Sequence, residues 1–435
     1  MALPQPAPRA LISGVLALAA ALLPGAAMAQ QAAGSAGDTA WVLTATALVL
    51  LMTLPGLALF YAGLVRANNV LSVMMHCLAI ACLMSVLWLA AGYSIAFAPG
   101  SSLFGSLDKA FLLNVGRDDL AGGLPEPVFF MFQATFAVIT PALIVGAYVE
   151  RIRFGAVLLF SGLWLLVVYA PVAHWVWGGG WLAQRGVLDF AGGLVVHATA
   201  GVSALVAAVM LGSRPGFPKD LHPPHNPGMT LIGAALLWVG WYGFNGGSAL
   251  AANGTAGMAI LVTHMSASAA ALTWALIEKL KFGRASMIGM ATGVIAGLAT
   301  VTPASGYIGP LGGLILGVVS GGVCFAAVDV VKHRLRIDDS LDVFAVHGVG
   351  GILGTLLLAF LVSSNLGGVG YAEGATPLSQ LGAQALGVGA VCAWSAIASV
   401  VLILITRMIT GWRNSEEALQ TGLDLSDHGE RAYTQ

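Results

Sequence analysis

The sequence predicts an all-α membrane protein with eleven transmembrane helices: an inverted repeat of five plus five, followed by one further helix. The N terminus is expected outside and the C terminus inside. Of the 435 residues, 58% are hydrophobic and only 9% are charged, whereas a typical soluble domain has about 25% charged residues. Apolar runs long enough to cross a bilayer recur along the chain, and positive charge is concentrated in alternate loops between them.

Residues 1–29 are expected to be a cleaved signal peptide rather than part of the fold. They contain Arg9, an apolar stretch at 11–23 and the small-residue sequence Ala-Met-Ala at 27–29, which is the pattern of a secretory signal. An uncleaved first span is the alternative. Cleavage would leave the mature N terminus on the outer side of the membrane.

Eleven later stretches are apolar over the about 20 residues that a bilayer crossing requires. They form a membrane domain at 30–409, with helices 1–5 at about 40–212, helices 6–10 at about 228–362 and helix 11 at about 379–409. A polar cytoplasmic tail follows at 410–435. Several spans exceed the hydrocarbon thickness and are expected to tilt. The individual spans are 40–65, 70–97, 127–149, 154–177, 189–212, 228–250, 255–277, 285–302, 311–331, 342–362 and 379–409.

The distribution of lysines and arginines among the loops tests the predicted orientation in the membrane. Only Lys109, Arg117 and Arg185 fall in predicted outer loops, and the other lysines and arginines of the mature chain fall in inner loops or the tail. Positive residues accumulate on the cytoplasmic side, so this bias supports the predicted orientation and requires an odd number of spans. The net charge of −1 gives no basic surface that would suggest nucleic acid as a partner. The apolar composition indicates a lipid bilayer instead.

Two spans each contain a histidine in a similar setting. His197 lies in GGLVVHATAG and His347 in DVFAVHGVGG; in both, a valine precedes the histidine and a glycine follows four residues later. Two five-span units related in this way have opposite topologies, and inverted repeats place functional sites near the midplane. An ionisable residue within a span is a functional candidate, the alternative being a core histidine bonded to a backbone carbonyl. His76 and His264 have no such match and are interpreted as core histidines.

Two neutral imidazoles that meet can share one proton and present their other nitrogens to a small molecule. Two functions fit: a path for protons and a small polar molecule, or axial ligation of haem iron. Phe136, Trp177 and Ser248 are expected near one outer mouth, where an aromatic face attracts a small cation and a hydroxyl accepts its hydrogen bond. The alternative for the aromatic residues is an interfacial belt and core packing.

Long motifs in this chain closely resemble the ammonium transporter (Amt/Mep/Rh) family, especially its bacterial Amt branch. The resemblance runs in order from about residue 40 to 433. The motifs are MTLPGLALFYAGLVRANNVLS, HWVWGGGWLAQRGVLDFAGGLVVH, WYGFNGGSA, ATVTPASGYIGP, DVFAVHGVGGILG and GLDLSDHGERAY.

The resemblance implies a homotrimer in the bacterial cytoplasmic (inner) membrane, with one pore in each subunit. It implies that His197 and His347 are the twin histidines of the pore. The implied recruitment site for ammonium consists of Phe136, Trp177 and Ser248, and the implied gate of Phe136 and Phe244. Supporting positions are Asp189 (as a helix cap), Trp241 and Thr302 (both in the lining of the pore region) and Asp342. Asp339 and Asp342 match acidic residues on the cytoplasmic side, for which a solvated loop and a helix cap are the alternative.

The implied function is an ammonium transporter or channel, which is not an enzyme and needs no cofactor. Ammonium is captured, loses its proton, and crosses as ammonia past the histidines, whereas potassium has no proton to lose. A PII-type nitrogen signalling protein is the implied cytoplasmic partner, docking in part on 213–227. The alternatives are an ammonium sensor, for whose signalling domain the tail leaves no room, and a haem electron carrier, which lacks the expected repeated histidine pairs.

Overall fold

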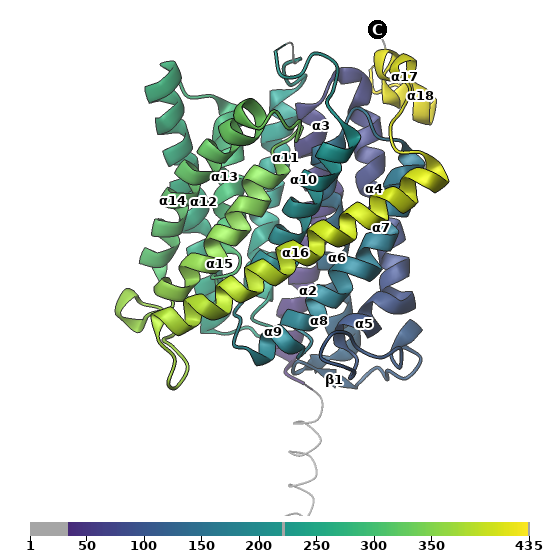
Figure 1. The fold of residues 1–435 in the computed structure, drawn as a ribbon. Coiled ribbons are helices and arrows are strands. Elements are labelled where there is room, and N and C mark those ends of the chain that lie inside the picture. The colour runs from purple at the N-terminus through teal and green to yellow at the C-terminus, as the bar shows by residue number, and fades with distance from the viewer. Residues whose placement is uncertain (1–33, 220–221, 434–435) are drawn as a thin grey trace, which may run out of the picture.

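The computed structural model describes residues 34–219 and 222–433, so the predicted signal peptide lies outside the described residues. These residues form a bundle of helices with one short hairpin, in which β1 (Leu120–Ala121) pairs antiparallel with β2 (Leu124–Pro125). Figure 1 shows the helices running between two ends of the molecule, with the hairpin at one end and the C terminus at the other.

The helices follow one another along the whole described chain. The first half contains α2 (Ala36–Leu51), α3 (Ala58–Leu64), α4 (Val70–Leu87), α5 (Tyr93–Phe97), α6 (Glu126–Tyr148), α7 (Phe154–Trp164), α8 (Ala170–Val176), α9 (Trp181–Gln184) and α10 (Thr199–Leu211). The second half contains α11 (Pro227–Trp241), α12 (Gly254–Phe282), α13 (Met287–Val301), α14 (Pro310–Asp329), α15 (Val349–Leu361), α16 (Pro377–Thr410), α17 (Glu416–Thr421) and α18 (Leu423–His428).

Short π-helical segments extend or interrupt several of these helices. They are Met52–Leu57, Trp88–Gly92, Leu165–Tyr169, Gly193–Ala198, Tyr242–Gly246, Val330–Arg334 and Phe344–Gly348, and short 3₁₀ turns lie at Ala67–Asn69, Ala110–Leu112 and Ser364–Leu366. His197, Phe244 and His347 each lie in a π-helical segment. Because π-bulges are rare and concentrate at functional sites, these three segments are candidates for parts of a functional site.

Within the described residues, nine helical runs are long and apolar enough to cross a membrane. They are Ala36–Leu64, Ala67–Phe97, Glu126–Tyr148, Phe154–Gln184, Gly193–Leu211, Gly254–Phe282, Pro310–Arg334, Phe344–Leu361 and Pro377–Thr410. The other two predicted spans, 228–250 and 285–302, contain the shorter helices α11 and α13, each of 15 residues. The helical membrane fold is thus confirmed, while the count of eleven stays a prediction.

Polar residues at the ends of apolar runs define where several helices start and stop. The side chains of Asn226, Asn253 and Ser286 each accept a hydrogen bond from a backbone N–H in the first turn of α11, α12 and α13. Thr376 forms a reciprocal capping pair with Ser379 at the start of α16. Such caps satisfy backbone donors that have no partner within the helix, and they mark helix starts within an otherwise apolar sequence.

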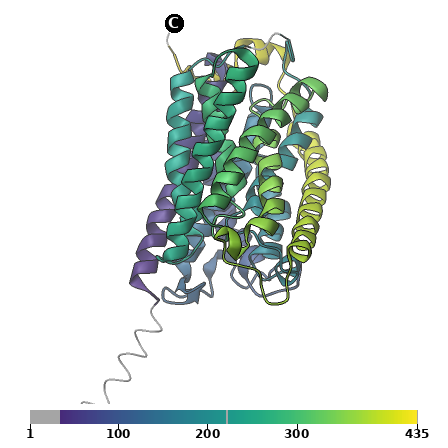
Figure 2. The same ribbon diagram turned by 90° about the vertical axis from the view of Figure 1, so that its left-hand side faces the viewer.

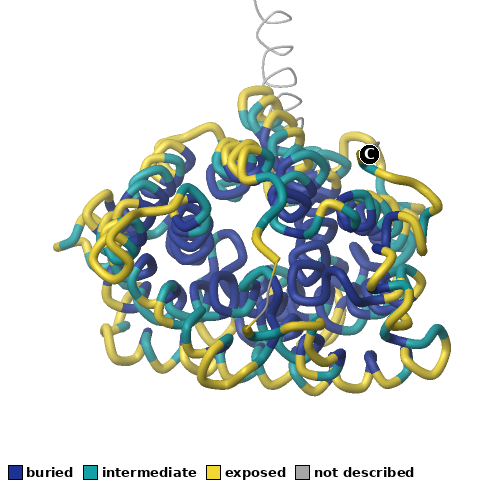
Figure 3. The backbone as a smooth tube through the Cα atoms, turned by 90° about the horizontal axis from the view of Figure 1, so that it is seen from above, coloured by how far each residue is buried: buried dark blue, intermediate teal, exposed yellow. Residues whose placement is uncertain are grey.

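Helix α16 shows the tilt expected of the longest span. Its 34 residues extend about 51 Å at a rise of about 1.5 Å per residue, which exceeds the about 30 Å hydrocarbon core. It crosses the bundle at a slant (Figure 1) and lies along one side of it (Figure 2). Viewed from above, buried residues fill the middle of the bundle and exposed residues surround them (Figure 3).

The loops segregate to the two ends as the alternating charge pattern predicts. At the end that carries the C terminus, Arg66 contacts both Glu150 and the backbone of Leu419. At the opposite end, the N–H of Trp181 donates to the carbonyl of Ser102. Loops predicted on one side of the membrane therefore lie together, and the assignment of the first of these ends to the cytoplasm stays a prediction.

Candidate functional site

The structure brings His197 and His347 together in the interior of the bundle. Their Nδ1 atoms are 3.2 Å apart, and their ring centroids are 5.2 Å apart with the planes inclined by 18°. Because a hydrogen bond needs one donor and one acceptor, one Nδ1–H donates to the bare Nδ1 of the other ring. In two neutral imidazoles, one Nε2 is therefore bare and the other carries a hydrogen.

Glycines in the two matched motifs allow this approach. A Cβ added at Gly201 would lie 2.3 Å from the Cα of Gly348, and one added at Gly351 would lie 2.6 Å from the carbonyl oxygen of Gly193. Each glycine four residues after a histidine thus contacts the helix that carries the other histidine. Contacts this close to backbone exclude any side chain, because the backbone has little room to move away.

Each histidine segment begins at a buried aspartate placed eight residues earlier, Asp189 for His197 and Asp339 for His347. The Asp189 carboxylate accepts hydrogen bonds from the four backbone N–H groups of 192–195, at 2.6–3.1 Å. The Asp339 carboxylate accepts one from the N–H at position 344, at 2.7 Å. Carboxylates at helix starts satisfy free donors and complement the helix dipole. Asp339 was predicted only as an acidic residue on the cytoplasmic side, and its correspondence to Asp189 was not predicted, although both lie eight residues before a histidine.

A narrow cavity borders the two histidines. The ring of Trp241 stacks on His197 with centroids 5.6 Å apart, and Phe244 lies on the same ring at 6.1 Å. Thr302 accepts a hydrogen bond from Trp241 Nε1 at 2.9 Å, so its contact is with the tryptophan behind the cavity wall. Beyond these aromatic and imidazole rings, the wall consists of apolar side chains: Met52, Leu57, Phe60, Ile139, Leu143, Val196, Leu237 and Ile295.

The size of this cavity restricts what can occupy it. Its volume is about 10 Å³, counted as the space open to the centre of a water molecule. This is room for roughly one water molecule. A molecule the size of ammonia fits beside the imidazoles. A haem does not fit, and this argues against the haem-ligand interpretation of the two histidines.

Two phenylalanines close the cavity on the side that is predicted to face outward. The rings of Phe136 and Phe244 are 4.3 Å apart between centroids, inclined by 39°, and both side chains are 1% exposed. Trp177 meets the edge of Phe136 at 5.9 Å. The pair predicted as a gate is therefore in contact and closed in this structure.

The three residues predicted to recruit ammonium, Phe136, Trp177 and Ser248, together line one vestibule of about 270 Å³. We call it the outer vestibule, after the side of the membrane that it is predicted to face. Trp177 Nε1 donates to the carbonyl of Asp189 at 2.8 Å, which holds the indole in place. Ser248 Oγ donates to the carbonyl of Phe244 at 2.8 Å. Since the serine hydrogen is engaged, its oxygen lone pairs are left to accept a hydrogen bond from a cation.

A second vestibule, of about 230 Å³, lies on the other side of the histidines and reaches His347. Asp342, a predicted supporting residue, lines it and contacts Lys332 Nζ at 2.8 Å. Phe60, Ile295 and His347 border both this vestibule and the narrow cavity. The histidine cavity therefore adjoins the second vestibule. The contact of Phe136 with Phe244 lies between this cavity and the first vestibule.

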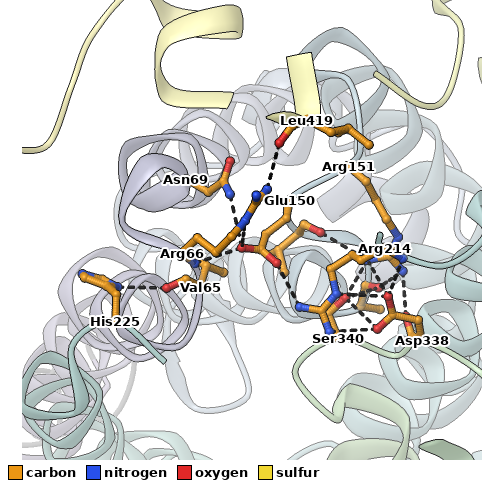
Figure 4. Close-up of polar contacts among 12 residues, drawn as sticks. Val65, Arg66, Asn69, Glu150, Arg151, Arg214, His225, Asp338, Ser340 and Leu419 are labelled. Atoms are coloured by element: carbon orange, nitrogen blue, oxygen red, sulfur yellow. Dashed lines mark hydrogen bonds and ion pairs between the residues drawn. The ribbon is translucent and has the colours of Figure 1, made fainter. Parts of the chain in front are cut away.

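An ion-pair network anchors the ends of several helices beside the second vestibule (Figure 4). Arg214 contacts Glu150 at 3.0 Å and Asp338 at 2.9 Å, and Arg66 contacts Glu150 at 3.2 Å. Burial alone would raise the pKa of Glu150. The charge and side-chain hydrogen bond of Arg214, with the backbone N–H and charge of Arg66, outweigh burial and hold this pKa below its ordinary value. This network was not predicted from the sequence.

Arg151 completes the network as a fully buried guanidinium (Figure 4). It donates to Ser340 Oγ and to the backbone carbonyls of Ala147, Val149, Gly212 and Asp338. A buried guanidinium requires such partners for its donors. This single side chain therefore ties the end of α6 to the loops that follow α10 and precede the His347 segment.

Comparison with known proteins decides the family. The family model "Ammonium Transporter Family" matches residues 40–433. The chain belongs to the ammonium transporter family. An ammonium transporter of Bacillus subtilis (strain 168) is 44% identical over 403 residues, covering 91% of this chain and 98% of the relative. Ammonium transporter 1 of Dictyostelium discoideum is 44% identical over 414 residues, covering 93% of this chain and 89% of the relative.

Solved structures of this transporter family share the fold. The crystal structure of Saccharomyces cerevisiae Mep2 superposes with a TM-score of 0.81 at 34% identity, covering 88% of this chain and 89% of Mep2. A structure named "Sensor Amt Protein" superposes with a TM-score of 0.83 at 29% identity, covering 90% of this chain and 98% of that protein. The expected multi-pass membrane transporter fold is thus confirmed.

Proposed function

We propose that this chain conducts ammonia after capturing ammonium, with His197 and His347 as the polar guides in the pore. The observation that carries the proposal is the pair of imidazoles beside a cavity with room for about one water molecule. The Nε2 of one histidine donates a hydrogen bond and the Nε2 of the other accepts one. Ammonia likewise both donates and accepts hydrogen bonds. The pair therefore complements neutral ammonia, whereas ammonium only donates.

Capture takes place in the outer vestibule. The aromatic faces of Phe136 and Trp177 attract the cation, and Ser248 Oγ accepts one of its hydrogen bonds. The closed pair of Phe136 and Phe244 separates this vestibule from the apolar cavity. Ammonium loses its proton at or below this pair, and ammonia passes on to the histidines.

Selectivity follows from the cost of moving a charge into the membrane interior. That cost ranges from about 3 to about 17 kcal/mol for a side-chain charge at the bilayer centre. Ammonium avoids it by leaving its proton, either at the outer face or relayed separately across the imidazoles. Potassium has no proton to leave, so the apolar cavity excludes it.

The proposal extends to the architecture and the partners. The protomer has eleven spans, with α11 and α13 contributing the two shorter ones, and its halves form an inverted repeat. The reciprocal packing of Gly201 and Gly351 and the matched caps Asp189 and Asp339 support this repeat. The protomers form a homotrimer in the bacterial inner membrane, with a PII-type protein docking at the cytoplasmic face; family membership supports these assignments.

Currents from proteoliposomes on a solid-supported membrane test the function. A jump in ammonium concentration is compared with an equal jump in potassium, while an internal pH dye reports entry of ammonia. A sustained current specific for ammonium indicates electrogenic transport with a relayed proton. A pH signal without current indicates an electroneutral ammonia channel. If neither signal arises from well-reconstituted protein, the transport proposal is wrong and a sensor is favoured instead.

A further inference from the structure

Gln133 is the amide side chain in the otherwise mainly apolar wall of the outer vestibule. It lines the vestibule together with Phe129 and Phe136, which precede and follow it on α6 by four and three residues. Residues at these spacings share one face of a helix. Gln133 is therefore presented to the same space as the aromatic ring that is proposed to bind the cation.

The carbonyl of this amide has no partner. Gln133 is only 9% exposed, and within the described part of the chain its Oε1 is buried without a hydrogen-bond donor. A buried acceptor left unpaired is unfavourable, and such a group calls for an explanation such as an absent ligand or water. The carboxylate on the same helix, Glu126, is already engaged by Tyr93 and Lys109.

We propose that Gln133 is a further ligand of ammonium in the outer vestibule, whose Oε1 accepts one of the four N–H groups of the cation. The proposal rests on the function proposed above and adds a residue to its capture step. Ser248 supplies one acceptor, and the π-faces of Phe136 and Trp177 supply attraction without a full hydrogen-bond acceptor. A second oxygen acceptor leaves fewer N–H groups of the bound cation without a partner.

A neutral amide suits this step better than a carboxylate. A carboxylate in a partly desolvated vestibule would hold ammonium as an ion pair and oppose its deprotonation, because the product ammonia has no charge to attract. An amide oxygen binds the cation more weakly and binds ammonia more weakly still. Gln133 therefore assists capture and permits release toward the gate formed by Phe136 and Phe244.

The test compares ammonium-dependent currents of the wild type with those of Gln133→Met, Gln133→Glu and a control, Gln184→Met. Methionine keeps the length and volume of glutamine but removes the carbonyl, whereas glutamate keeps an oxygen acceptor and adds charge. Gln184 is exposed on the same side of the molecule and donates to the carbonyl of Gly179. Each current is measured as a function of ammonium concentration in folded, reconstituted protein.

For Gln133→Met we expect the half-saturating ammonium concentration to rise about tenfold, with the saturating current unchanged within about twofold, because a hydrogen bond to a charged group is lost from capture alone. For Gln133→Glu the half-saturating concentration does not rise, and Gln184→Met behaves as the wild type. If the Gln133 amide contributed only packing, the half-saturating ammonium concentration would rise equally in both Gln133 variants. That result would overturn the inference.

Two further outcomes separate this inference from the proposed function. If the wild type carries ammonium and Gln133→Met keeps its half-saturating concentration, whatever its saturating current, then Gln133 is no ligand while the transport function stands. If the wild type itself gives neither current nor pH signal, the transport function is wrong and the inference is wrong with it.

Discussion

The Nδ1 atoms of His197 and His347 face each other at 3.2 Å across two nearly parallel rings. Each ring therefore sets the tautomer of the other, and the two outward nitrogens differ in hydrogen-bonding role. Loss of either imidazole removes a hydrogen-bonding group from the pore. It also removes the partner that orients the other imidazole. The pair is expected to act as a unit, so the effects of single and double substitutions should not add.

The first prediction is that His197→Leu and His347→Leu each abolish ammonium flux or let intact cations pass. Either change removes a hydrogen-bonding group from an apolar cavity. The one imidazole that remains alters both the passage of ammonia and the exclusion of intact cations. Ammonium and potassium currents measure the two effects. His264→Leu is the control, since His264 bonds to Tyr242 away from this cavity. Full ammonium current with unchanged selectivity in both variants would contradict the mechanism.

The second prediction concerns the glycines at the helix contact. Gly201→Ala and Gly351→Ala should each lower the free energy of unfolding by about 1–3 kcal/mol, the usual cost of overpacking, and reduce ammonium current by displacing the imidazoles. Gly322→Ala and Gly389→Ala serve as controls, because an added Cβ meets no atom within 4 Å at either position. Thermal unfolding in detergent is the measurement, and equal stability in all four variants would show that the contact tolerates a side chain.

The third prediction is a pH dependence that originates at Asp339. Burial and the charge of Asp342 raise the pKa of Asp339 from 3.8 to about 7, although the N–H of Phe344 opposes the shift. A raised pKa means that the folded protein favours the protonated acid. Its contribution to stability is full below about pH 4 and is lost as the pH rises through about 7.

Melting temperatures at pH 5 and pH 8 check this. The wild type should lose more stability between these values than Asp339→Asn, which cannot titrate. The depressed pKa values of Glu150 and Asp338 act in the opposite direction and at lower pH, since their stabilisation is lost only as the pH falls below about 4. An identical slope in wild type and variant would exclude Asp339 as the titrating group.

The fourth prediction concerns the docked tail. Asp424 in α18 accepts a hydrogen bond from the backbone N–H of Ser72 at 2.7 Å, at the start of α4. Asp424→Ala removes this cap and should cost about 0.5–2 kcal/mol. We expect faster proteolytic cleavage after Thr410, compared with the control Glu430→Ala at an exposed position. Equal cleavage rates would mean that other contacts, such as Arg66 to Leu419, suffice to hold the tail.

Local patterns predicted much of the fold and part of the site. Of the eleven spans predicted from apolar run lengths, nine are long apolar helices in the described part of the chain. The shared valine-histidine-glycine motif matched His197 with His347. The cap role of Asp189 followed from its position before a helix start. These features depend on neighbouring residues or on equal spacing, so a single sequence carries them.

Other features escaped prediction for a physical reason. Arg151 looked like an ordinary positive loop residue, yet it is fully buried and donates to carbonyls at the end of α6 and in two separate loops. Thr302 was expected near the pore lining, but its hydroxyl supports Trp241 from behind. Gln133 carried no distinguishing motif. Each depends on how helices rotate and pack, which sequence spacing does not encode.

The sequence by itself determined that this chain crosses a membrane, roughly where each span lies, and which two histidines correspond. Composition and periodicity suffice for these properties because the bilayer imposes the same length and polarity on every span. The tertiary structure alone decided that the two Nδ1 atoms meet, that Phe136 and Phe244 close the path, and that one water-sized space lies beside the imidazoles. These properties require distant segments to approach within a few ångströms, and that approach depends on glycine contacts and helix rotation.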